Sequence, residues 1–173
     1  RAMMLLRANS LAKGYSGIRP CVVQLLIDML NKRIHPVVPR KGSIGASGDL
    51  VPLAHIGLCL IGEGTVVYQD TMMSSKEAFE KERLEPVLLQ AKEGLALING
   101  TQLMSALGCL FVYDAEQLLK HAQIAGALSL EAIKGTNLAF REEIHHLRPH
   151  KGQMKCAKNL WRLTQNSTIH ESH

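Results

Sequence analysis

Apolar residues recur every three or four positions over most of the chain, which is the spacing of amphipathic helices. In the first segment, Met4, Leu5, Ala8 and Leu11 lie along one side, and Pro20 stands where a proline favours the start of the next helix. This pattern predicts helices over residues 1–13, 20–33, 50–61, 100–134 and 151–164, with a further helix beginning near 74. We therefore expect a mainly α fold.

Two features interrupt the helical pattern. Residues 64–70, GTVVYQD, are rich in valine and tyrosine between turn residues, which favours a short β segment. Two prolines between residues 34 and 41 favour an extended segment there. Ser74, followed three positions later by Glu77, is typical of a capping box at the start of a helix, and Pro86 limits that helix.

The stretch from 94 to 113 has no charged residue and approaches the length that spans a membrane. Asn99, Thr101, Gln102 and Ser105 are nevertheless clustered in its first half. A helix that is apolar on nearly all sides is also required at the centre of a large helical assembly. We therefore expect a buried helix rather than a membrane span.

Composition narrows the class of protein. With 46% hydrophobic and 20% charged residues, the chain of 173 residues is not wholly disordered, and 4% aromatic residues leave little for base stacking. The formal net charge is +5. The basic residues Arg1, Arg7, Lys13 and Arg19 are spread out, so we expect them on solvated helix faces rather than in a nucleic-acid site.

The four cysteines, Cys21, Cys59, Cys109 and Cys156, form no C-x-x-C pair. Cys59 and Cys109 lie in apolar runs, where a buried free thiol behaves as a small hydrophobic side chain. Because no signal peptide is evident, we expect a cytoplasmic protein.

The histidines do not predict a metal site. His145, His146 and His150 lie close together, but Pro149 disrupts the helical register that a pair of ligands four residues apart would need. His55 lies on an apolar helix and is expected to be a core histidine. We therefore assign no metal.

The glycine-rich loop at 42–49, GSIGASGD, allows three interpretations besides a plain turn. It lacks the lysine and glycine spacing of a phosphate-binding loop. As a hydrolase nucleophile elbow it is weak, because Asp49 stands in place of the last glycine of G-x-S-x-G. In the third interpretation, Ala46-Ser47-Gly48 condenses with itself to 4-methylidene-imidazol-5-one (MIO).

The MIO chemistry needs small residues. The amide nitrogen of Gly48 attacks the carbonyl carbon of Ala46, and loss of two waters, one of them from Ser47, leaves a ring with an exocyclic methylene. Glycine supplies the least hindered nitrogen and allows the sharp fold of the backbone. Asp49 is expected to cap the helix behind the loop or to tune the surroundings of the ring. The start of that helix would favour the electrophilic character of the ring.

Four blocks of sequence together resemble the aromatic amino acid ammonia-lyases, most closely their histidine-specific branch. They are LRANSLAKGYSGIRP, GSIGASGDLVPLAHIGLCLIGEG, AKEGLALINGTQ and IHHLRPHKGQ. The resemblance covers nearly the whole chain and implies the helical ammonia-lyase fold, with long core helices over about 100–135. It further implies a homotetramer, so other copies of this chain are expected partners.

The resemblance implies that Ala46, Ser47 and Gly48 form the MIO and that no external cofactor is used. The MIO methylene would capture the amino group of L-histidine, a base would remove a β-proton, and trans-urocanate and ammonia would leave. Asn99, in the NGT motif, matches a hydrogen-bonding partner of the MIO and the bound substrate. Without the resemblance, an asparagine before a glycine more often only ends or starts a helix.

Family subunits are longer than 173 residues. We therefore expect residues 1–173 to be a single piece of an ammonia-lyase subunit that lacks N-terminal and C-terminal portions, and to be inactive in isolation. Two alternatives stay open. One is a phenylalanine or tyrosine ammonia-lyase or aminomutase, which shares the loop, and the other is a catalytically silent, truncated helical module.

Overall fold

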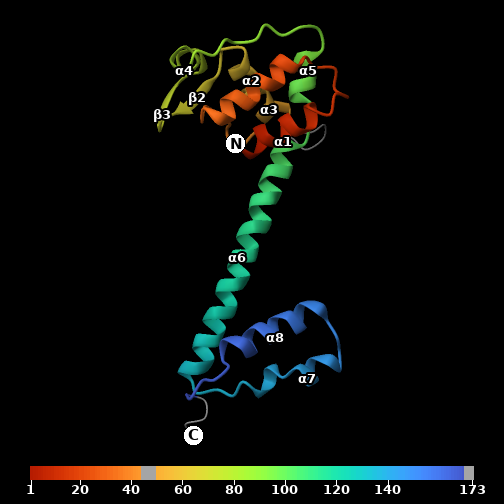
Figure 1. The fold of residues 1–173 in the computed structure, drawn as a ribbon, viewed down its shortest axis with the longest axis vertical. Helices are drawn as coiled ribbons and strands as arrows, with labels where there is room; N and C mark the ends of the chain where they lie inside the picture. Colours follow the sequence, from red (N-terminus) through yellow and green to blue (C-terminus); the bar gives the residue numbers. More distant parts are fainter. Residues whose placement is uncertain (44–49, 170–173) are drawn as a thin grey trace. The chain divides into compact units, whose positions relative to one another are not determined.

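The computed structural model describes residues 1–43 and 50–169. The chain divides into two compact units, Arg1–Leu110 and Phe111–His173, and each is described by itself. The fold is mainly helical, as the sequence predicts (Figure 1). The described elements are α1 (Ala2–Leu11), α2 (Pro20–Asn31), β1 (His35–Pro36), α3 (Leu50–Leu60), β2 (Thr65–Tyr68), β3 (Thr71–Ser74), α4 (Ser75–Glu82), α5 (Glu93–Ile98), α6 (Gln102–Ala132), the 3₁₀ turn η1 (Leu138–Phe140), α7 (Glu142–His146) and α8 (Lys151–Leu163).

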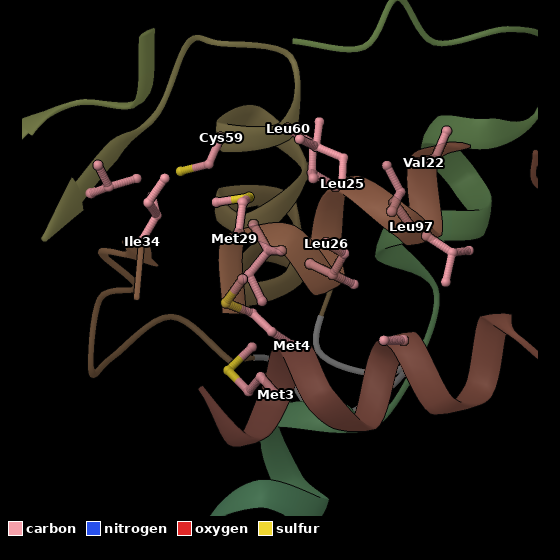
Figure 2. Close-up of a cluster of buried hydrophobic side chains, with 14 of the residues drawn as sticks. Met3, Met4, Val22, Leu25, Leu26, Met29, Ile34, Cys59, Leu60 and Leu97 are labelled. Atoms are coloured by element: carbon pink, nitrogen blue, oxygen red, sulfur yellow. The ribbon is translucent and has the colours of Figure 1, made fainter. Parts of the chain in front are cut away.

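Helices α1, α2, α3 and α5 enclose the hydrophobic core of the first unit. Met4 of α1 and Met29 of α2 are almost completely buried in it, and Leu97 of α5 joins them (Figure 2). Cys59 of α3 is also fully buried, as the sequence predicts, and this burial raises the pKa of its thiol to about 12. Such a thiol stays neutral and packs as a hydrophobic side chain.

The β structure is larger than the sequence pattern indicates. The expected segment at 64–70 contributes β2, but three strands form an antiparallel sheet in the order β1-β2-β3. Strand β2 ends at Tyr68, because Gln69 and Asp70 both have positive φ (49° and 60°) and form a two-residue hairpin turn. Tyr68 pairs with Thr71 across that turn. The sequence pattern places a turn residue at the end of this segment but predicts no strand after it, because neither Gln69 nor Asp70 is the glycine that marks a hairpin turn.

The predicted capping box is confirmed at the start of α4. The Ser74 hydroxyl accepts a hydrogen bond from the Glu77 amide at 3.2 Å, and the Glu77 carboxylate accepts one from the Ser74 amide at 3.0 Å. Helix α4 ends at Glu82, where Arg83 adopts the left-handed conformation (φ 54°), so the helix stops before Pro86.

A buried carboxylate joins the beginnings of α2 and α5. Glu93, whose side chain is 3% exposed, accepts hydrogen bonds from Nε and Nη2 of Arg19 at 2.8 Å each and from the Gln90 amide at 2.7 Å. These bonds, chiefly those from Arg19, lower the pKa of Glu93 to about 2. The sequence predicted that Arg19 lies on a solvated helix face. Instead, Arg19 forms an ion pair with the buried carboxylate of Glu93.

Substitution Glu93→Gln is expected to lower the free energy of unfolding by about 2 kcal/mol at neutral pH, because it leaves Arg19 without its counter-charge. Glu93 has a folded pKa of about 2 against an ordinary value of 4.5. Its contribution is therefore complete above pH 4.5 and is lost as the pH falls toward 2. Thermal unfolding of wild type and variant across this range measures the effect. The exposed control Glu63→Gln should change little, and equal unfolding curves for wild type and Glu93→Gln at pH 7 would contradict the role of the pair.

In the second unit, α8 packs against α7 and η1. Asn159 of α8 donates a hydrogen bond to Gln123 of α6 at 2.9 Å, and Thr164, just after α8, is fully buried. The predicted helix over 151–164 is confirmed as α8.

Most of α6 is exposed in this chain. The stretch Glu93–Ala132, which includes both α5 and α6, is long and apolar enough to cross a membrane. Of its most apolar segment of 18 residues, 17% is buried. Side chains such as Phe111 (73% exposed) and Leu118 (70%) lie open, and Cys109 is exposed too. The prediction that Cys109 is buried is therefore wrong for the chain by itself, because α6 has few neighbours within it. Burial of α6 inside an assembly stays a prediction.

Candidate functional site

The structure describes one of the predicted site residues, Asn99. The MIO precursors Ala46, Ser47 and Gly48, together with Asp49, lie outside the described residues. The segments that flank the loop are described: Ser43 before it is exposed, and α3 begins directly after it at Leu50. The position of the loop relative to Asn99 is therefore not tested by the structure.

Helix packing brings the helix that follows the loop into contact with the helix that ends at Asn99. Helix α3 packs against α5 within the first unit (Figure 1). At this contact Gly57 of α3 faces Ile98, the last residue of α5: a Cβ added to Gly57 would lie 4.0 Å from Cγ2 of Ile98. His55 of α3 is half-buried, less enclosed than the core histidine that the sequence predicts. The helix that begins directly after the candidate cofactor loop thus contacts the helix that ends at Asn99.

Asn99 lies in a short turn between two helices. Its amide donates to the carbonyl of Leu95 at 3.0 Å, and its extended conformation (φ −85°, ψ 93°) ends α5. Helix α6 starts three residues later at Gln102. The residue is exposed, and within the described part of the chain its side chain makes no hydrogen bond. An amide group held in this way is available to a ligand.

Arg7 of α1 holds this turn from the protein interior. Its Nη2 donates to the carbonyl oxygens of Ala96 and Asn99, the latter at 3.0 Å. Its Nη1 donates to Oε1 of Gln102 at 3.0 Å. One guanidinium group therefore bridges the end of α5 and the start of α6.

The burial of Arg7 contradicts its predicted place on a solvated face. The residue is 5% exposed, and burial lowers the pKa of its guanidinium from the ordinary value. Sequence reasoning missed it, although a signal was present. Arg7 stands in the apolar stripe of α1 between Met4 and Leu11, where a charged residue needs internal partners.

The second unit contains a pocket of about 750 Å³ lined in part by Phe140, Lys155 and Trp161. Asn99, the predicted site residue that the structure describes, does not line this pocket. Among the residues that the structure describes, no group of three or more histidine, cysteine, aspartate or glutamate side chains could hold a metal ion.

Comparison with known proteins decides the family. The family model described as aromatic amino acid lyase matches residues 1–173. The chain belongs to this family. A histidine ammonia-lyase of Alkaliphilus metalliredigens is 56% identical over 169 residues, which are 98% of this chain and 33% of the relative.

Two solved structures share the fold of this chain. A histidine ammonia-lyase from Trypanosoma cruzi is 40% identical, with a TM-score of 0.87 over 98% of this chain and 34% of that one. An ergothionase from Treponema denticola, an ergothioneine-degrading enzyme, is 34% identical, with a TM-score of 0.93 over 99% of this chain and 34% of that one. The chain has the helical ammonia-lyase fold and spans about a third of the length of these relatives.

Proposed function

We propose that this chain is the part of a histidine ammonia-lyase subunit that supplies the electrophile and one substrate-binding residue. The reaction is the non-oxidative deamination of L-histidine to trans-urocanate and ammonia. The observation that carries the proposal is 56% identity with a histidine ammonia-lyase over 98% of the chain. This exceeds the 34% identity with the ergothionase, which shares the fold but degrades another compound.

The residues at 46–48 fit the family's prosthetic group. Ala46 offers an unhindered carbonyl, Gly48 an unhindered amide nitrogen, and Ser47 the hydroxyl that is eliminated. When formed, the MIO supplies an electrophilic methylene to the amino group of the substrate. These three residues therefore supply every atom that the MIO requires, and no external cofactor is proposed.

Asn99 is proposed to orient the bound amino acid. Its exposed carboxamide offers two N–H donors and one acceptor, which suit a substrate with both an amino and a carboxylate group. Since the backbone of Asn99 is anchored at both its amide and its carbonyl, the side chain is presented from a fixed base. Fixed donors stabilise developing charge better than mobile ones, because little reorganisation is needed.

Further copies of this chain are proposed to cover α6, as the predicted homotetramer requires. Several of its large apolar side chains, including Leu107, Phe111 and Leu118, are more than half exposed, and exposed apolar side chains that cluster mark interaction surfaces. The same coverage would bury Cys109.

A direct assay tests the function. The full-length polypeptide that contains this chain is expected to convert L-histidine to urocanate at about 1–1000 per second, as followed by the ultraviolet absorbance of the product. L-phenylalanine and L-tyrosine are assayed in parallel. Preferential turnover of either would assign the chain to the alternative branch of the family, and turnover of none would indicate the silent module.

The 173-residue chain alone is expected to be inactive in the same assay, because Asn99 and the loop are only part of a site that family members complete with further segments. Urocanate formation by the isolated chain at the rate of the full polypeptide would contradict this expectation.

A further inference from the structure

We propose that Arg7 is a positioning residue of the lyase reaction: its buried guanidinium fixes the turn from which Asn99 reaches the substrate. This inference rests on the proposed function, because it assigns a role to Arg7 through Asn99. Arg7 and Asn99 are 92 residues apart in the sequence, and the fold places the guanidinium directly under the turn.

The surroundings of Arg7 set it apart from an ordinary structural arginine. It is 5% exposed, yet no salt bridge to a carboxylate is found for it among the described residues. Its Nε is buried without a hydrogen-bond partner there. A buried, unpaired charge costs free energy, and a hydrophobic side chain of similar size would avoid that cost. Among the described residues, the side-chain hydrogen bonds of Arg7 go to the segment 96–102, and these bonds offset the cost of its burial.

Those hydrogen bonds determine the position of Asn99. The carbonyls of Ala96 and Asn99 are acceptors at the end of α5, where helix carbonyls lack intrahelical partners and carry partial negative charge. Gln102 is the first residue of α6. The fork of one guanidinium thus sets both ends of the turn, which a lysine ammonium cannot reproduce because it lacks the planar fork.

Gly100 shows how closely the guanidinium approaches the turn. A Cβ added to Gly100 would collide with Oε1 of Gln102 and with Nη1 of Arg7. Both atoms are ends of flexible side chains. An alanine at this position would therefore displace the Arg7–Gln102 hydrogen bond while the fold is retained.

The test uses the full-length enzyme with two variants that disturb the contact from opposite sides, Arg7→Lys and Gly100→Ala. Each is expected to lower kcat/KM for L-histidine by about 10–100-fold, because a small displacement of a binding group costs that much. Amide hydrogen exchange of the segment 95–103 is expected to become faster in both. The matched control Arg162→Lys, at an exposed position of α8, should behave as wild type.

A double-mutant cycle separates positioning from general stabilisation. In an Asn99→Ala background, Arg7→Lys is expected to cost little further activity, because the group that it positions is gone. If Arg7→Lys lowers activity equally in both backgrounds, or if an active enzyme keeps the wild-type kcat/KM in both single variants, this inference is overturned alone. A wild-type enzyme without lyase activity would overturn the proposed function, and this inference with it.

Discussion

Ser47→Ala is expected to lower kcat for L-histidine by at least about 10³-fold, the largest effect of any substitution considered. The alanine side chain has no hydroxyl to eliminate, so the exocyclic methylene of the MIO cannot form. Without it the amino group has no electrophile, and the amine remains a poor leaving group. The measurement is steady-state turnover of the full-length variant.

A second measurement on the same variant detects the MIO ring directly. The near-ultraviolet absorbance of the conjugated MIO is expected to disappear in Ser47→Ala, whereas the fold measured by circular dichroism stays unchanged. Thr71→Ala, which removes a hydroxyl at an exposed position of β3, is the control and should keep both activity and absorbance. Full activity and unchanged absorbance in Ser47→Ala would rule out the MIO at this loop.

Asn99→Ala is expected to lower kcat/KM by about 10²–10³-fold, with the MIO absorbance retained. The substitution removes a carboxamide that is exposed and anchored only through its backbone, so the helices on both sides of the turn should persist. Because the predicted contact is with the substrate and the ring, binding and turnover should both suffer. Steady-state kinetics with L-histidine measures the two separately.

The control for Asn99 is Asn31→Ala, at an exposed position at the end of α2, which should leave the kinetics unchanged. Wild-type kinetics in Asn99→Ala would show that the asparagine only ends α5. That outcome would also remove the basis for a positioning role of Arg7.

The local elements of the fold could be predicted because their signals are local. Pro20 begins α2, and Ser74 with Glu77 begins α4, each through interactions within one helical turn. The hairpin at Gln69 and Asp70 could not be predicted, because these residues adopt positive φ without the glycine that usually marks such a turn.

The support of the candidate site could not be predicted, because it depends on contacts between distant segments. Two partners of Arg7 are backbone carbonyls 89 and 92 residues away, which no residue type in the sequence indicates, and the third is the side chain of Gln102, 95 residues away. The pair of Arg19 and Glu93 spans 74 residues in the same way. Asn99 itself was found through its motif, and the loop at 46–48 through its chemistry, which the described residues leave untested.

The most direct test of the ring is the mass of one peptide. Trypsin is expected to release residues 42–76 of the natively produced polypeptide as a single peptide, because no lysine or arginine lies between Lys41 and Lys76. If Ala46-Ser47-Gly48 condense, this peptide is about 36 Da lighter than its sequence requires, the mass of two waters. The same peptide of Ser47→Ala should not show that loss. A wild-type peptide of full mass would contradict the formation of the electrophile, and with it the lyase mechanism proposed for this chain.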